Sequence, residues 1–226
     1  MRQISLGQIL SFSTLLSTIL ALAVGSTWLL LGDLPLEDFR GVTLALAALV
    51  LTYLWAFLIY RLFLLVMPLK EGDIPEGSRE EFVAQVDTLF YLMLFYPLIR
   101  THFLPVPLLR LVYLALGAKL GRNTYIAGVV LDPPLTFMGD NCLIGHDAVL
   151  FSHAIEGRHF SLSAIRIGND VTIGATAVLM SGVTIGDGAI VSAGAVVIKG
   201  TRIGAGETWG GVPAKLLHRG RTEIAE

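Results

Sequence analysis

The sequence has few charged residues and almost no cysteine. Of its 226 residues 15% are charged and 54% are hydrophobic, with a mean hydropathy of +0.71. That is more apolar than a soluble domain, so a membrane-associated protein is predicted. The net charge of −2, without runs of Lys and Arg, predicts no nucleic-acid partner. The single cysteine, Cys142, excludes an internal disulfide and a paired-cysteine metal site, and is compatible with a reducing compartment.

Two long uncharged runs lie in the N-terminal third of the chain. No charged side chain occurs from Gln3 to Gly32. Within it, Ile9 to Leu31 is long enough, at about 1.5 Å per residue, to cross a hydrocarbon layer of about 30 Å. A cleaved signal peptide is the alternative, but the apolar core of such peptides is shorter. The second run extends from Gly41 to Tyr60 and continues beyond Arg61. We therefore predict two transmembrane helices within residues 1–70.

The charges beside these runs predict their orientation. The connector between the two runs is mostly acidic, with Asp33, Glu37, Asp38 and Arg40. Arg2 precedes the first run, and Arg61 and Lys70 lie at the far end of the second. Basic residues favour the cytoplasmic side of a membrane. We expect an integral protein of the plasma (inner) membrane with its C-terminal domain in the cytoplasm.

Residues 71–118 alternate between polar and apolar stretches. The polar segment EGDIPEGSREEF is followed by VDTLFYLMLFYPLI and FLPVPLLRLVYLALG, which Pro97, Pro105 and Pro107 interrupt. Arg100 and Arg110 stand where helices lying in the headgroup region would place their cations. We predict interfacial, amphipathic helices here, and a membrane-buried hairpin or an apolar core seam stays open as an alternative.

A six-residue apolar period runs through the second half of the chain. Large aliphatic residues recur at this spacing, at Ile167, Ile173, Leu179, Ile185, Val191, Val197 and Ile203. A small or β-branched residue follows four positions later, at Val171, Ala177, Val183, Ala189, Ala195 and Thr201. Neither a helix nor a single uninterrupted strand has this period. Short strands and turns repeated around a triangular coil do, so a β-helix is predicted over residues 119–217.

The same frame extends backward with two irregularities. Aliphatic positions fall at Leu120, Ile126, Met138, Ile144 and Leu150, and small positions at Thr124, Val130, Thr136, Cys142 and Ala148. Asp132 interrupts the frame within LDPPL. The separation of 17 residues between Leu150 and Ile167 is not a multiple of six, so a loop must leave the coil after His153. Residues 218–226 are predicted to be a C-terminal tail.

Two motifs carry a family resemblance. IGNDVTIGATAVLMSGVTIGDGAIVSAGAVV and GGVPAKLL resemble the hexapeptide-repeat acyltransferases, which include sugar O-acetyltransferases and serine acetyltransferase. The resemblance covers about Leu120 to Leu217 and implies a left-handed parallel β-helix with CoA-dependent O- or N-acyltransferase activity. GAKLGRNTYI and SHAIEG, after a membrane half, are similar to the membrane-embedded C-terminal region of polylysine-synthetase-like proteins. The expected fold is α + β, with transmembrane and interfacial helices before the β-helix.

The resemblance points to the loop for chemistry. In that family a histidine directly precedes an extruded loop, and LFSHAIEG places His153 there as the implied general base. An imidazole can take a proton from a hydroxyl or amine near neutral pH and return it to a departing thiolate. Glu156 could orient this imidazole, with Asp132 as the alternative orienter or a substrate contact. His146 could serve a neighbouring subunit's cleft, and His159 is expected to be a loop contact.

The resemblance also implies a co-substrate and an assembly. Acyl-CoA, with acetyl-CoA as the first choice, would lie between adjacent β-helices of a homotrimer. The matching positions are Ala193 and Gly194, whose small size admits the pantetheine arm, and Lys199, which would meet the 3′-phosphate. Trp209 matches the family element beside the cofactor and is expected to cap the apolar end of the coil. A membrane tether suggests a membrane-linked glycan, lipid or amine as acceptor.

Two other functions compete with this interpretation. A zinc hydratase resembling γ-class carbonic anhydrase uses the same β-helix with three histidines. The spacings between His146, His153 and His159 do not match that family, so no metal is predicted. The second alternative is a non-enzymatic membrane scaffold, which would not bind coenzyme A.

Overall fold

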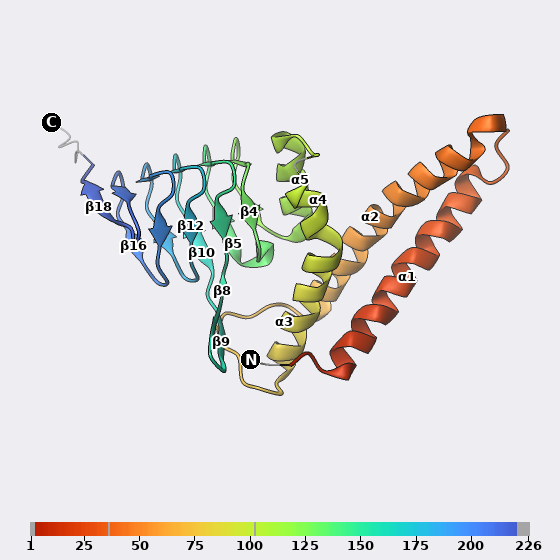
Figure 1. The fold of residues 1–226 in the computed structure, drawn as a ribbon, viewed down its shortest axis with the longest axis horizontal. Coiled ribbons are helices and arrows are strands. Elements are labelled where there is room, and N and C mark those ends of the chain that lie inside the picture. Colours follow the sequence, from red (N-terminus) through yellow and green to blue (C-terminus); the bar gives the residue numbers. More distant parts are fainter. Residues whose placement is uncertain (1–2, 36, 102, 221–226) are drawn as a thin grey trace. The chain divides into compact units, whose positions relative to one another are not determined.

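The computed structural model describes residues 3–35, 37–101 and 103–220, so the end of the predicted C-terminal tail lies outside the described residues. The chain divides into two compact units. The helical unit comprises the chain up to Pro68 together with Glu81–Pro97. The repeat unit comprises Leu69–Glu80 and the chain from Leu98 onward. Figure 1 shows the elements of both units.

The helical unit begins with two long helices. They are α1 (Leu6–Leu31) and α2 (Arg40–Val66), with a short 3-10 turn, η1 (Glu37–Phe39), before α2. A capping box starts α1, since the Ser5 hydroxyl accepts from the Gln8 amide and the Gln8 side chain accepts from the Ser5 amide. The guanidinium of Arg40 donates to the carbonyl of Gly32 at 2.6 Å. These contacts fix the start of α1 and close the turn between the two helices.

A third helical run follows the polar segment. It consists of α3 (Arg79–Phe90), the π-helical turn η2 (Tyr91–Phe95) and α4 (Tyr96–Arg100). The sequence predicted interrupted interfacial pieces here, whereas the structure has one continuous run. The π-helical turn ends two residues before Pro97, which lacks the amide proton that a regular helix would use.

Aromatic side chains join the three helical runs within the helical unit. The Phe12 ring meets the Phe90 ring edge-on at 5.4 Å, and the rings of Phe57 and Phe95 stack at 4.9 Å. Tyr60 is fully buried, and its hydroxyl donates to the Asp87 carboxylate at 2.7 Å. The bond supplies a partner for a carboxylate that would otherwise be costly to bury.

The outer faces of these helices are strongly apolar. Leu29 and Leu65 are 85% and 74% exposed, and many neighbouring leucines and valines are exposed with them. Leu6–Leu31, Glu37–Val66 and Arg79–Arg100 are long and apolar enough to cross a membrane, by length and composition. Composition thus allows a third span beyond the two that the sequence predicted.

The repeat unit is a β-helix whose strands form three parallel sheets. The first sheet holds β2 (Lys119–Leu120), β5 (Thr136–Met138), β10 (Ile165–Ile167), β13 (Thr184–Ile185) and β16 (Arg202–Ile203). The second holds β3 (Tyr125–Ile126), β6 (Leu143–Ile144), β11 (Thr172–Ile173), β14 (Ile190–Val191) and β17 (Thr208–Gly210). The third holds β4 (Val129–Val130), β7 (Val149–Leu150), β12 (Val178–Leu179) and β15 (Val196–Val197). The final strand, β18 (Lys215–His218), pairs antiparallel with β17.

The register confirms the six-residue frame and corrects it at one position. The predicted aliphatic residues stack in ladders; Met138, for example, pairs with both Leu120 and Ile167. Val130, predicted in a small position, instead occupies an aliphatic position, where it pairs with Leu150 and is fully buried. The part of the first coil that precedes Val130 is therefore shorter than the corresponding part of the other coils. The 3-10 turn η3 (Pro133–Leu135) restores the frame by Met138.

Helix α5 (Val106–Leu116) covers the start of this short coil. It begins after Pro105 and ends at Gly117, whose φ of 105° requires glycine. The buried Tyr113 hydroxyl donates to the carbonyl of Gly128 at 2.8 Å and accepts from the Val130 amide at 3.2 Å. Burial raises the pKa of Tyr113, which keeps the phenol neutral and able to donate. One side chain thus satisfies two backbone groups of the irregular coil.

Replacing Tyr113 by phenylalanine should destabilise the repeat unit by about 1 to 3 kcal/mol, because two buried backbone groups lose their partner. Thermal unfolding of the purified protein measures the effect. Tyr125→Phe is the control, since the Tyr125 hydroxyl makes no hydrogen bond within the described residues. Equal stability of both variants would contradict the role given to Tyr113.

Candidate functional site

A β-hairpin leaves the coil where the frame breaks. It consists of β8 (His153–Glu156) and β9 (His159–Leu162), which project from the stacked coils in Figure 1. At its base, the carbonyl of Ser152 accepts from the Ser163 amide at 2.8 Å and from the Ser181 hydroxyl at 2.7 Å. The predicted loop is confirmed, and His153 is the first residue of its first strand.

Asp132 binds His153 and the backbone beside it. Its Oδ2 atom accepts from the Ser152 amide at 2.6 Å and from the His153 amide at 3.1 Å. The same atom lies 2.8 Å from His153 Nδ1, and Oδ1 lies 3.1 Å from it. An ionised carboxylate only accepts, so Nδ1 carries the proton and Nε2 is the basic nitrogen. The carboxylate therefore fixes both the position and the tautomer of the imidazole.

The short first coil explains why Asp132 lies there. Because Val130 already fills the aliphatic position, Asp132 is not directed into the core as the six-residue frame would require. The Leu131 amide still donates to the carbonyl of Leu150, and the chain then enters η3. This leaves Asp132 beside Ser152 on the next coil, with 8% of its surface exposed.

The structure corrects the predicted orienting role of Glu156. This carboxylate does not bond the imidazole; it pairs with Lys199 Nζ at 3.1 Å. His153 and Glu156 stand at opposite ends of β8, and three residues of extended chain span about 10 Å. A turn would bring the two side chains together, whereas the segment is a strand. Asp132, named from sequence as the alternative, takes the orienting position.

The hairpin and the coil together line an open cavity of about 330 Å³. Its lining comprises Phe151, His153, Ala154, Ile155, Glu156, Met180, Ser181 and Lys199. The ring of Phe151 lies 5.6 Å from that of His153. The His153 side chain is 34% exposed, while that of Asp132 is 11% exposed. The cavity therefore combines mostly apolar walls with one oriented imidazole and one ion pair.

Among the residues predicted to bind CoA, Lys199 lines this cavity and three do not. Ala193 and Gly194 form the turn between β14 and β15, at another corner of the coil, and Gly194 has a φ of 69°. Trp209 lies in β17, and its indole donates to Glu207 at 2.8 Å. The role of all four in binding CoA stays a prediction.

The two other candidate histidines, His146 and His159, are not among the residues that line the cavity. His146 is in the turn between β6 and β7, with Nδ1 2.9 Å from Asp147 and a side chain 63% exposed. His159, in β9, lies 3.2 Å from Asp73. In the part of the chain that the structure describes, no three potential metal ligands gather. Among these residues the structure therefore contains no assembled set of three ligands of the kind that the zinc hydratase interpretation needs.

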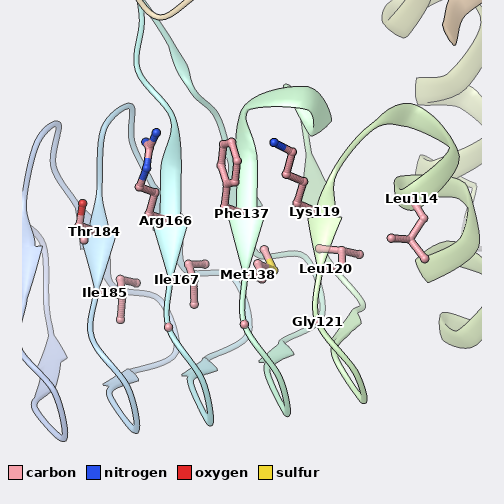
Figure 2. A pocket seen from close by; sticks show the side chains of 12 residues that line it. Leu114, Lys119, Leu120, Gly121, Phe137, Met138, Arg166, Ile167, Thr184 and Ile185 are labelled. Carbon is pink, nitrogen blue, oxygen red and sulfur yellow. The ribbon is translucent and has the colours of Figure 1, made fainter.

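A second hollow, a groove of about 700 Å³, crosses the first sheet. Figure 2 shows Phe137 between Lys119 and Arg166, on the outer side of the sheet. The two cationic groups lie 4.5 and 5.0 Å from the ring centre. Sequence reasoning used only the inward residues of each strand and passed over these outward ones, although alternation along a strand implies them.

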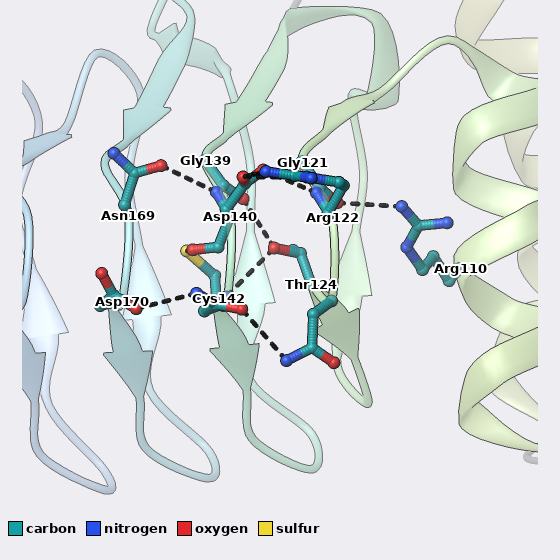
Figure 3. Close-up of polar contacts among 11 residues, drawn as sticks. Arg110, Gly121, Arg122, Thr124, Gly139, Asp140, Cys142, Asn169 and Asp170 are labelled. Carbon is teal, nitrogen blue, oxygen red and sulfur yellow. Dashed lines mark hydrogen bonds and ion pairs between the residues drawn. The ribbon is translucent and has the colours of Figure 1, made fainter.

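A polar ladder lines the corner between the first and second sheets (Figure 3). The Asp140 carboxylate accepts from the Arg122 amide at 2.7 Å, and the Asp140 amide donates to the Asn169 side chain at 2.9 Å. The Asn141 side chain donates to Asp170 at 3.1 Å. Cys142 beside it is buried, as its small core position predicted, and burial raises its thiol pKa. The ladder supplies hydrogen-bond acceptors for backbone amides in the turns, so we assign it a role in stabilising the coil.

Comparisons with known proteins give a family model and several similar proteins. The family model described as Bacterial transferase hexapeptide (six repeats) matches residues 164–199. A delta-poly-L-ornithine synthetase of Acinetobacter baumannii (strain AB307-0294) is 32% identical over 105 residues, which are 45% of this chain and 8% of that protein. A hexapeptide-repeat acetyltransferase of Vibrio cholerae O1 biovar eltor, solved with acetyl coenzyme A, is 31% identical over 45% of this chain and 60% of its own, with a TM-score of 0.41.

A galactoside acetyltransferase in complex with coenzyme A covers 66% of this chain and 84% of its own at 23% identity, with a TM-score of 0.47. The family match supports the predicted resemblance: residues 164–199 have the hexapeptide repeats of bacterial transferases. The chain spans 8% of the curated relative and 60% of the Vibrio protein.

Proposed function

We propose that this protein is a membrane-anchored acyltransferase that moves an acyl group from acyl-CoA to a hydroxyl or amine of a membrane-associated acceptor. The observation that carries the proposal is the Asp132–His153 pair, at 2.8 Å, beside a cavity of about 330 Å³. Acetyl is the first choice of acyl group, because residues 164–199 match hexapeptide repeats of bacterial transferases and two similar solved structures are acetyltransferases that contain acetyl-CoA or CoA.

The chemistry follows from the orientation of the imidazole. His153 Nε2 takes the proton from the acceptor oxygen or nitrogen as that atom attacks the thioester carbonyl carbon. The tetrahedral intermediate then collapses, the C–S bond breaks, and the imidazolium returns the proton to the departing thiolate. Asp132 stabilises the imidazolium through Nδ1–H and holds the ring in place. The products are an acyl ester or amide and free CoA.

Binding of the co-substrate is assigned to the predicted positions. Lys199 contributes a cation at the rim of the cavity, where a phosphate of CoA would displace Glu156 from it. Ala193, Gly194 and Trp209 are proposed to contact CoA in a groove shared with a second copy of the chain, since the resemblance implies a homotrimer. A histidine of one copy and turns of another would then form each site.

The acceptor is proposed to be held by the membrane. The exposed apolar faces of α1 and α2 support an anchor in the bilayer, with the repeat unit on the cytoplasmic side, where acyl-CoA is available. An anchored enzyme gains encounter rate only for an anchored partner. A lipid, a lipid-linked glycan or a membrane amine therefore fits better than a soluble acceptor.

The test uses the full chain in lipid nanodiscs with acetyl-CoA labelled in its acetyl group. Purified total membrane lipid and glycan extract serves as the acceptor pool. We expect label in the extract and free CoA in equal amounts, with both lost in His153→Ala. Alkaline hydroxylamine would remove an ester label and leave an amide, which separates O- from N-acylation.

The same preparation separates the competing functions. Calorimetric binding of CoA without any transfer or thioester turnover would contradict an enzyme, and absence of CoA binding would favour the scaffold. Stoichiometric zinc in the active protein would favour the hydratase instead. Label transfer that persists in His153→Ala would remove His153 from the mechanism.

A further inference from the structure

The segment Leu69–Glu80, here called the strap, pairs with the hairpin that carries His153. It follows α2 in the sequence, precedes most of α3, and belongs to the repeat unit. Its short strand β1 (Gly72–Asp73) runs antiparallel to β9, so that the sheet order is β1, β9, β8. The Ile74 amide extends the pairing by donating to the carbonyl of Phe160 at 2.8 Å. The hairpin is thereby a three-stranded sheet.

Glu71 fixes one end of the strap to the coil. Its carboxylate accepts from the Ala164 amide at 2.9 Å and from the Arg166 guanidinium at 2.7 Å. Ala164 stands between the end of β9 and the return of the chain into the first sheet. Glu71 therefore holds the point at which the hairpin rejoins the repeats.

Glu76 fixes the strap to the tip of the hairpin. Its carboxylate accepts from the Arg158 guanidinium at 2.7 and 3.0 Å, and Arg158 lies in the turn between β8 and β9. Between these two anchors, Ile74 is only 3% exposed and Asp73 lies 3.2 Å from His159. The strap thus contacts the base, the middle and the tip of the same hairpin.

We propose that the strap positions the catalytic base, with Glu71 and Glu76 as positioning residues. A two-stranded hairpin is marginally stable in water, and a third strand with an apolar contact stabilises it. His153 begins β8, the strand on the opposite side of β9 from the strap. Docking of the strap therefore favours the hairpin orientation in which His153 meets Asp132. This inference rests on the proposed function of His153.

Acid should loosen the strap. The hydrogen bond from Arg166 lowers the pKa of Glu71, with a further contribution from the Ala164 amide. Since the folded-state pKa is depressed, this contribution to stability is present above the pKa of the unfolded chain and is lost as pH falls through the folded-state value. Hydrogen exchange in β9 should accordingly rise, relative to the other coils, when the pH falls below the ordinary glutamate range.

The test compares Glu76→Arg, Arg158→Glu and the variant with both changes, in the full chain in nanodiscs. Each single change sets like charges against each other, whereas the exchanged pair restores attraction. We expect hydrogen exchange of β8 and β9 to rise about fivefold in each single variant and to recover in the double variant, as expected for one exposed ion pair. Arg122→Glu is the matched control, because it disrupts an exposed ion pair with Asp140 at another corner.

Two further readouts decide the inference. The Nδ1 proton of His153, observed by NMR of ¹⁵N-labelled protein, should lose its carboxylate-bonded signal in Glu71→Gln combined with Glu76→Arg. Turnover of acetyl-CoA should fall together with this signal. It should fall less in Glu76→Arg alone, and adding Arg158→Glu to that single variant should restore it. Loosened hairpins with an unchanged His153 signal would overturn the inference. A wild-type protein with the His153 signal but without turnover would instead contradict the proposed function.

Discussion

Replacing His153 by alanine should lower acetyl-CoA turnover by a factor on the order of 10² to 10⁴, the range typical of a positioned general base. The alanine variant keeps the coil, because the His153 amide still donates to Asp132 and the Ser152 carbonyl still accepts from Ser163 and Ser181. Release of CoA thiol measures the rate. Unfolding temperature and CoA affinity, measured on the same sample, show whether the site is otherwise intact.

Asp132→Asn tests the carboxylate that orients His153 while leaving in place the imidazole that transfers the proton. The amide keeps the shape of the side chain but loses the charge that stabilises the imidazolium, so a loss of roughly 10- to 1000-fold is expected. The loss should appear in kcat more than in the KM for acetyl-CoA, because Asp132 is not among the cavity-lining residues. Arg122→Glu should leave the rate unchanged. A fully active Asp132→Asn protein would show that the 2.8 Å contact has no role in turnover.

The repeat half of this fold could be predicted almost residue by residue. Inward aliphatic side chains recur every six residues, so the place of each one in the coil can be assigned from neighbouring residues in the sequence, without knowledge of distant segments. The same local signal marked both irregularities, at LDPPL and after Leu150. It did not say how the chain responds to them: Val130 moves into an aliphatic position, and the excluded segment becomes a hairpin.

The site was harder to predict because its key contacts join distant residues. Asp132 and His153 lie 21 residues apart, and nothing in the spacing says that they meet. The proximity of Glu156 in sequence favoured the wrong carboxylate, since a strand separates neighbours that a turn would bring together. The contacts of the strap are more remote still: Glu71 binds Arg166, which lies 95 residues later, and the sequence identified the segment around Glu71 only as polar.

Gly128 connects the irregular coil to the proposed chemistry. A methyl group there would collide with the backbone carbonyl of Ala148 and lie 3.0 Å from its carbon atom. That carbonyl also accepts from the Val129 amide at 2.7 Å, and the Gly128 carbonyl accepts from Tyr113. The collision involves backbone on both sides, so the coil cannot relieve it by moving a side chain. The glycine allows two adjacent coils to approach closely.

Gly128→Ala should therefore destabilise the repeat unit by about 1 to 3 kcal/mol, as overpacking does, and should also shift Asp132, which follows four residues later. Gly188→Ala is the matched control, because it strains the backbone without a collision between coils. Its φ of 66° disfavours alanine by about 1 to 2 kcal/mol, but no atom lies within 4 Å of the added methyl group. Both variants should unfold at lower temperature, measured by tryptophan fluorescence, and only Gly128→Ala should lose turnover below its unfolding transition. Equal turnover in the two folded variants would mean that the short coil does not position Asp132. The turn η3 alone would then hold the carboxylate beside His153.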